Sequence, residues 1–191
     1  LALLDPNEPS KVIALTSSVP REGKSVTSLC LAEILAQAGE SVVVVDCDVR
    51  RHGLTNLVSE AANAQIGIVE AIKKNLPLND VLVLDPRSGA WVLPVAQHEG
   101  VPEDLFSTKQ WDALVRSLSQ RFDHVILDTP PLLGVADSRI LCTKADKVLF
   151  VVHWNKTPMS AVQAAADILQ QCGAKVAGAV LAQVNIRQQA R

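Results

Sequence analysis

Short, almost continuously apolar runs alternate along the chain with longer segments of helical periodicity. A strand that is apolar along its whole length needs cover on both faces, and parallel sheets obtain this cover from the helices that connect successive strands. The alternation therefore predicts an α/β fold, with a central, mostly parallel sheet and helices on both of its faces. The predicted strands are residues 12–16, 41–46, 90–95, 124–128, 147–153 and 176–184.

Two of the predicted helices have recognisable ends. In the segment STKQWDALVRSLSQRF, Ser107 and Gln110 have the spacing of a capping box. In the segment TPMSAVQAAADILQQCG, Thr157 is the predicted N-cap and Gly173 the left-handed end. The predicted surface loops are residues 53–65, 85–89 and 97–106.

The size and charge of the chain limit its domain organisation and its partners. It has 191 residues, of which 48% are hydrophobic, and this is enough for one buried core, so residues 1–191 are expected to form a single domain. The 18 basic and 20 acidic side chains give a net charge of −2. No overall basic surface follows from this balance, and no nucleic acid is expected as a partner.

The cysteines and the apolar runs indicate a cytoplasmic domain. The four cysteines include no CxxC pair, so we expect buried, reduced thiols rather than a zinc site or a disulfide framework. No apolar run approaches the ~18 residues that a membrane span needs. The first residues also lack a charged segment followed by an apolar signal core. The cysteines are Cys30, Cys47, Cys142 and Cys172.

The segment SSVPREGKSV, residues 17–26, lies between a predicted strand and a long apolar stretch. It matches the second half of the phosphate-binding pattern GxxxxGK[ST]. In this pattern backbone N–H groups and a helix N-terminus surround the phosphates, the lysine reaches the terminal ones, and the hydroxyl ligates magnesium. Taken alone, the segment also fits an ordinary strand-to-helix turn capped by a serine. The predicted nucleotide-binding residues here are Ser18, Pro20, Arg21, Glu22, Gly23, Lys24, Ser25 and Val26.

Three acidic residues follow predicted strands. Asp46 and Asp48 lie in VVVVDCDVR, and Asp128 lies in HVILDTPP. The carboxyl ends of parallel strands meet at the edge where open α/β sheets bind ligands. A lone aspartate after a strand is usually a turn former or a helix cap. Three of them beside a GKS loop instead favour ATP or ADP with Mg²⁺, because this ion takes one or two carboxylates and the loop hydroxyl.

Together the segments SSVPREGKS, VVVVDCDVRR and FDHVILDTPP resemble the bacterial tyrosine autokinases, or BY-kinases. The catalytic domain of that family is a P-loop ATPase related to MinD and ParA. The resemblance continues through ADKVLFVVHWNKTPMSAV and so covers nearly the whole chain. An apolar run followed by DxDxR is the motif that this family adds to the usual two nucleotide motifs.

The resemblance implies specific roles for the charged residues. Lys24 is implied to contact the phosphates, and Asp46 to orient or deprotonate the attacking hydroxyl. Ser25, Asp48 and Asp128 are implied to hold the metal. This set agrees with the chemistry, since phosphoryl transfer depends on positioning and charge neutralisation more than on covalent help.

Six further positions bear on nucleotide binding. The partitioning relatives carry a signature lysine where this chain has Val19, which weakens the resemblance to them. Arg21 replaces a glycine common in the kinases, so we expect the backbone here to avoid a conformation that only glycine favours. Gln183 and Asn185 lie in the region where related ATPases contact the adenine base. A contact of Arg50 and Arg51 with phosphate or a neighbouring subunit is left open beside a solvated basic turn.

The resemblance also implies features that residues 1–191 lack. The kinases have an upstream helix with an ExxRxxR pattern that assembles a ring of subunits, and a downstream tyrosine cluster that accepts phosphate. This chain contains no tyrosine. We expect both features to lie outside these residues. Other copies of the protein, and a membrane domain in cis or an activator protein in trans, are the implied partners, with the domain held at the bacterial inner membrane.

The favoured interpretation is an ATP-dependent, magnesium-requiring protein-tyrosine kinase domain that phosphorylates a tyrosine tail. Control of exopolysaccharide or capsule synthesis and export follows from the resemblance alone. One alternative is a MinD- or ParA-like assembly switch, which uses ATP to dimerise and phosphorylates nothing. A second is an ATP-binding regulatory subunit without kinase activity.

Overall fold

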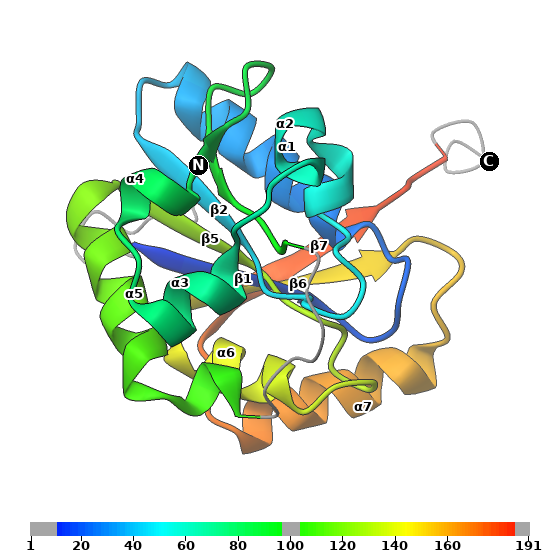
Figure 1. Ribbon diagram of the computed structural model, residues 1–191. Coiled ribbons are helices and arrows are strands. Elements are labelled where there is room, and N and C mark those ends of the chain that lie inside the picture. The colour runs from blue at the N-terminus through cyan, green and yellow to red at the C-terminus, as the bar shows by residue number, and fades with distance from the viewer. Residues whose placement is uncertain (1–10, 97–103, 186–191) are drawn as a thin grey trace.

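A computed structural model describes residues 11–96 and 104–185, so the predicted loop residues 97–103 lie outside the description. Its centre is a sheet with the strand order β3-β4-β2-β5-β1-β6-β7 (Figure 1). Neighbouring strands are parallel except for β3 and β4, which are antiparallel. The strands are β1 (Val12–Ser17), β2 (Val42–Asp46), β3 (Val83–Leu84), β4 (Trp91–Leu93), β5 (His124–Asp128), β6 (Lys147–His153) and β7 (Val176–Ala182).

Helices cover both faces of the sheet, as the sequence predicted. One face carries α1 and α2, and the other carries α3, α5, α6 and α7 (Figure 1). No helix in the described ranges is long and apolar enough to cross a membrane. The helices are α1 (Lys24–Gln37), α2 (Ser59–Ala62), α3 (Ile68–Lys74), α4 (Leu78–Val81), α5 (Lys109–Arg121), α6 (Asp137–Lys144) and α7 (Met159–Gln171), with 3₁₀ turns η1 (Thr55–Leu57) and η2 (Leu105–Ser107).

The alternating faces of the central strands explain why these strands are apolar throughout. In β1, Val12 and Ala14 belong to one core, with Trp111 of α5, whereas Ile13 and Leu15 belong to the other. Successive side chains of a strand point to opposite faces, so a strand between two helical layers buries every residue. The prediction of central, doubly covered strands is therefore confirmed for β1, β2 and β5, whose residues are all buried.

Each predicted strand is present, with ends that differ by a few residues. The prediction of cover on both faces is wrong for β7, because this strand is the edge of the sheet, and Val176 and Leu181 are 48% and 57% exposed. The antiparallel β3 was not predicted, since it has two residues and no period can be read from so short a run.

Two predicted helix caps are wrong. Helix α5 is capped by Thr108, whose hydroxyl accepts a hydrogen bond from the Trp111 N–H at 3.2 Å, and not by Ser107, which belongs to η2. Helix α7 begins one residue after Pro158, and the Thr157 hydroxyl donates to Glu22 instead of capping the helix. The left-handed end at Gly173 is confirmed, with φ +71°.

The predicted surface loops are partly buried. Leu54 and Thr55, in the first of them, are 0% and 3% exposed, and Leu105 and Phe106 of η2 are 2% and 1% exposed. Leu54 and Thr55 lie near the start of the first loop, and Leu105 and Phe106 lie at the end of the third. Their burial was not predicted because these segments have no regular apolar period. The 85–89 segment is a tight turn between β3 and β4, closed by a hydrogen bond from Gly89 N–H to Asp85 O at 2.9 Å.

The cysteines differ from one another in exposure. Cys47 and Cys142 are buried as predicted, but Cys30 is exposed on α1 and Cys172 is only partly buried, so the prediction of a buried thiol is wrong at these two positions. Burial raises the pKa of the Cys47 thiol well above its usual value, and the nearby Asp46 carboxylate adds to the rise. Burial also raises the pKa of Cys142 to about 12. Both buried thiols are therefore poor nucleophiles, because the thiolate is the reactive form.

This difference predicts selective alkylation. Iodoacetamide at pH 8 should modify Cys30 in the folded protein and leave Cys47 and Cys142 unmodified until the protein is unfolded in guanidinium. Mass spectrometry of the digested protein, with the unfolded sample as the reference, measures the extent at each cysteine. Equal modification of Cys47 and Cys30 in the folded protein would contradict the burial described here.

Candidate functional site

The phosphate-type loop connects the end of β1 to the first turn of α1. The Ser17 hydroxyl donates to Val19 O at 2.9 Å, and the Thr27 hydroxyl donates to Gly23 O at the same distance. Gly23 has φ +97°, and a Cβ atom there would lie 3.2 Å from Ala182 Cβ. Both the conformation and the close approach of β7 require glycine at this position. The loop therefore presents its backbone and the N-terminus of α1 at the carboxyl edge of the sheet.

Arg21 adopts a conformation that glycine favours. Its φ is +67°, so the expectation that its backbone would avoid this region is wrong. A non-glycine residue reaches left-handed φ values at a cost of about 1 kcal/mol, which the surroundings must offset. Here the Gln183 side chain, from the end of β7, donates from Nε2 to Arg21 O at 3.1 Å. The residue predicted to lie near the adenine thus also holds the loop.

Glu22 points into the protein and away from the loop's open side. It is 1% exposed, and its carboxylate accepts hydrogen bonds from Val19 N–H at 2.7 Å, from the Thr157 hydroxyl and from His153 N–H at 3.4 Å. This carboxylate ties the loop to the connection between β6 and α7. Among the predicted nucleotide-binding residues, Glu22 therefore has a side chain that supports the loop and does not line its pocket.

The sheet register places two acids next to each other. Asp46 at the end of β2 pairs with Asp128 at the end of β5. Asp128 Oδ2 accepts from the Ser25 hydroxyl at 2.6 Å, and its Oδ1 accepts from the Ser28 hydroxyl at 3.2 Å. Burial and then the Asp46 charge raise the pKa of Asp128 to about 7, against the opposing effects of Lys24 and the two hydroxyls.

Asp46 is fully buried and holds the segment that follows β2. Its Oδ1 accepts from Asp48 N–H at 3.1 Å, and its Oδ2 accepts from the N–H and hydroxyl of Thr55 at 2.9 and 2.7 Å. The Thr55 hydroxyl in turn accepts from Val95 N–H at 3.0 Å. Burial raises the pKa of Asp46, and the Thr55 hydrogen bonds oppose the rise. Thr55 was not predicted from the sequence, because it lies in a segment without periodicity.

A pocket of about 380 Å³ opens beside the loop. Several predicted site residues line it, together with Arg51, whose contact with phosphate the sequence left open, and three residues that were not predicted: Gly53, Leu57 and Pro131. Arg51 lines the pocket and Arg50 does not. Asn185 is exposed and also lies outside the lining. The predicted residues that do line the pocket are Pro20, Arg21, Gly23, Lys24, Ser25, Val26, Asp48 and Gln183.

The donors and acceptors of this pocket suit a nucleotide phosphate with magnesium. Lys24 lines the pocket at the start of α1 and is 8% exposed. Ser18 is not part of the lining, and its buried hydroxyl has no hydrogen-bond partner within the described residues. Asp48, Ser25 and Asp128 lie at the same edge. The described residues contain no group of three or more His, Cys, Asp or Glu side chains that could hold a metal by themselves. Two carboxylates and a hydroxyl instead fit Mg²⁺ that keeps phosphate oxygens and waters as its other ligands.

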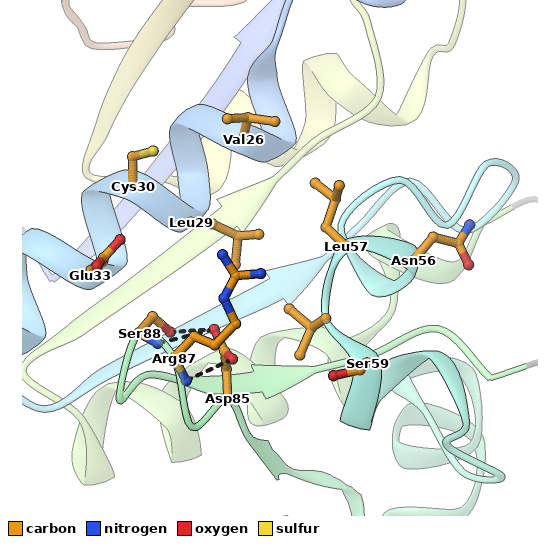
Figure 2. A pocket seen from close by; sticks show the side chains of 11 residues that line it. Val26, Leu29, Cys30, Glu33, Asn56, Leu57, Ser59, Asp85, Arg87 and Ser88 are labelled. Atoms are coloured by element: carbon orange, nitrogen blue, oxygen red, sulfur yellow. Dashed lines mark hydrogen bonds between the residues drawn. The ribbon is translucent and has the colours of Figure 1, made fainter.

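A larger hollow of about 490 Å³ adjoins this pocket (Figure 2). It lies between the outward face of α1, the segment from η1 to α2 and the turn between β3 and β4. Val26 and Leu57 line both hollows. The two hollows are therefore adjacent, with these two exposed apolar side chains at their junction.

The hydroxyl of Thr55 predicts a measurable contribution to stability. Thr55→Val keeps the shape of the side chain but leaves Val95 N–H and part of the Asp46 carboxylate without a partner, which should lower the free energy of unfolding by about 2 kcal/mol. Thr55→Ser keeps the hydroxyl and should lower the free energy of unfolding clearly less than Thr55→Val does. Urea unfolding of the two variants measures the difference, and equal losses would show that the hydroxyl bonds contribute nothing.

The raised pKa of Asp128 predicts a pH dependence of stability in the absence of nucleotide and metal. The folded protein binds this proton more tightly than the unfolded chain, so Asp128 destabilises the fold progressively as the pH rises from about 4 to about 7 and has a constant effect above that. Asp128→Asn removes this contribution, at about 1.4 kcal/mol for each unit of pKa difference. The stability of the variant relative to wild type should therefore rise across this range and then level off. Denaturant unfolding in EDTA at several pH values measures it, and a constant difference would contradict the assignment.

The chain matches a protein-family model and several characterised relatives. The model, described as an AAA domain, matches residues 10–177. Ptk of Acinetobacter johnsonii, a tyrosine-protein kinase, is 32% identical over 90% of this chain and 23% of Ptk. ExoP of Rhizobium meliloti (strain 1021), a succinoglycan biosynthesis transport protein, is 30% identical over 94% of this chain and 23% of ExoP. The chain thus spans about a quarter of the length of these two relatives.

Two further comparisons cover more of the matched protein. The tyrosine-protein kinase YwqD of Bacillus subtilis (strain 168) is 31% identical over 90% of this chain and 71% of YwqD. The crystal structure of the VpsO kinase domain superposes with a TM-score of 0.84 and 31% identity, over 94% of this chain and 87% of that domain. The family model matches most of the residues of this chain, and YwqD and the VpsO kinase domain are each 31% identical to it over at least 90% of its length. The chain therefore belongs to the AAA-domain P-loop ATPases and, among them, to the bacterial tyrosine-protein kinases.

Proposed function

We propose that this chain is the catalytic domain of an ATP-dependent, magnesium-requiring protein-tyrosine kinase. The observation that carries the proposal is an open pocket at the carboxyl edge of the sheet, lined by Lys24, Ser25 and Asp48, with the buried Asp128 carboxylate hydrogen-bonded to the Ser25 hydroxyl. These groups come from three separate segments of the chain, and the register of β1, β2 and β5 brings them together. The kinase names of the relatives support the proposal.

The side chains of the pocket have distinct parts in this proposal. Lys24 neutralises charge on the terminal phosphates, and Ser25, Asp48 and Asp128 hold Mg²⁺ that is bound through the nucleotide. Magnesium, when bound, supplies further charge neutralisation at the phosphoryl group. A cation at this position also favours the ionised form of Asp128, which burial opposes.

Asp46 is better suited to positioning than to proton abstraction. It is 0% exposed, and three hydrogen bonds from Asp48 and Thr55 occupy its two oxygens. We infer that it orients Asp48 and the segment that lines the pocket. A loose transition state for phosphoryl transfer makes little demand on a strong base, so the phenol proton can pass to solvent.

The acceptor tyrosine is not among these 191 residues, which contain none. In the proposed reaction the phenolic oxygen bonds to the terminal phosphorus while the bond to the leaving ADP oxygen breaks. We propose that the acceptor belongs to another copy of the protein or to a part of the polypeptide outside these residues. A membrane domain in cis, or an activator in trans, is the proposed partner at the cytoplasmic face of the bacterial inner membrane. The name of ExoP supports a role in exopolysaccharide synthesis.

The proposal predicts ATP-dependent formation of phosphotyrosine by the native polypeptide that contains these residues. With Mg²⁺ and labelled ATP, this polypeptide and its activator, where separate, should become phosphorylated on tyrosine. Lys24→Met removes the charge that faces the terminal phosphates and should lower the rate at least roughly 100-fold. Phosphotyrosine immunoblotting and mass spectrometry measure the product, and calorimetric titration measures nucleotide binding.

Further variants separate binding from transfer. Asp48→Asn should reduce transfer more than it reduces binding of ADP, since its charge acts on the metal and the terminal phosphoryl group. The 191 residues alone should bind nucleotide and form no phosphotyrosine. If the native polypeptide binds ATP, dimerises and stays unphosphorylated, the kinase proposal fails and an assembly switch replaces it.

A further inference from the structure

The hollow beside the nucleotide pocket has a floor and walls of mixed character (Figure 2). Its apolar wall includes Val26 and Leu29 of α1 and Leu57 of η1, and Val26 and Leu57 are 54% and 45% exposed. Its rim carries Glu33 from α1 and Arg87 from the turn between β3 and β4. An exposed apolar surface next to charged groups is typical of a surface that contacts another polypeptide.

The turn that carries the rim arginine is held by its own hydrogen bonds. Asp85 accepts hydrogen bonds from Arg87 N–H at 3.1 Å and from the Ser88 hydroxyl at 2.6 Å, so its carboxylate is engaged within the turn. Figure 2 shows the Arg87 side chain extending toward Leu29 of α1. Within the described residues, no carboxylate forms an ion pair with the Arg87 guanidinium. The turn therefore presents a cation at the rim.

The position of the hollow relates it to the proposed reaction. Val26 and Leu57 line both hollows, so the apolar wall begins where the nucleotide pocket ends. Asp48, Arg51 and Leu57 all line the nucleotide pocket, and all three belong to the segment that follows β2. A polypeptide lying in the hollow would thus approach the phosphate loop from the side of these residues.

We infer that this hollow binds the acceptor polypeptide of the proposed kinase, an inference that rests on the proposed function. The occupant is an extended segment with a tyrosine and an acidic residue near it. The tyrosine enters the nucleotide pocket past Val26 and Leu57, apolar atoms beside it lie on the wall, and the acidic side chain pairs with Arg87. Because these 191 residues contain no tyrosine, the segment reaches the hollow from outside them.

The experiment reverses the charge at position 87 of the rim and, in parallel, the charge of the residue near the tyrosine in the peptide. The native polypeptide in its phosphorylating form is assayed with tyrosine peptides that carry a single glutamate or a single lysine at successive positions on either side of the tyrosine. The wild type should prefer glutamate at one set of positions. Arg87→Glu should raise KM for those peptides about tenfold and lower KM for the matching lysine peptides, while KM for ATP is unchanged.

Arg116→Glu is the matched control, because Arg116 is an exposed arginine on α5, which covers the opposite face of the sheet. It should behave as the wild type with both kinds of peptide. Equal KM values for Arg87→Glu and Arg116→Glu with every peptide would overturn the inference. A change in oligomeric mass without a change in peptide KM would overturn it too, in favour of an interface between copies. Absence of any phosphotyrosine in the wild type would instead contradict the proposed function.

Discussion

The adjacent burial of Asp46 and Asp128 is the constraint around which the rest of the site is built. The pairing of β2 with β5 places both carboxylates at one edge, where they are almost inaccessible to water. Burial disfavours the ionised form of both acids and raises both pKa values, and the charge of Asp46 raises the pKa of Asp128 further. Hydroxyls of Ser25 and Thr55, together with the Lys24 charge, offset part of this cost. Lys24 and the hydroxyls of Ser25, Ser28 and Thr55 converge on the two acids, whose burial without such partners would be highly unfavourable.

The loop itself is held from two sides by residues far away in the sequence. Glu22 binds the connection between β6 and α7, and Gln183 at the end of β7 binds the carbonyl of Arg21. These contacts lie on either side of the left-handed backbone at Arg21 and Gly23 and favour that conformation. Preorganised donors of this kind are the ones that stabilise developing charge without rearrangement. The first half of the chain thus supplies the loop, and the second half fixes its conformation.

Helix α1 contributes to both the nucleotide pocket and the larger hollow beside it. Its N-terminus is at the nucleotide pocket, its inward residues Ala32 and Leu35 pack on the sheet, and its outward residues form the wall of the larger hollow. The segment after β2 faces α1 across both hollows, and Asp46 holds it through Thr55. The hydrogen bonds between Thr55 and the buried Asp46 therefore also fix the position of the segment that lines the larger hollow.

The sequence by itself determined the layers of the fold and the residue types of the site. Apolar runs of strand length and the spacing of Gly23, Lys24 and Ser25 are local patterns. Such patterns can be read from the sequence without knowing which distant segments they contact in the fold. Only the tertiary structure decided the rest. It showed that Glu22 turns inward, that Thr55 holds Asp46, and that Arg51 lines the pocket while Arg50 does not. These outcomes depend on contacts between segments that are distant along the chain, and on burial that no period in the sequence encodes.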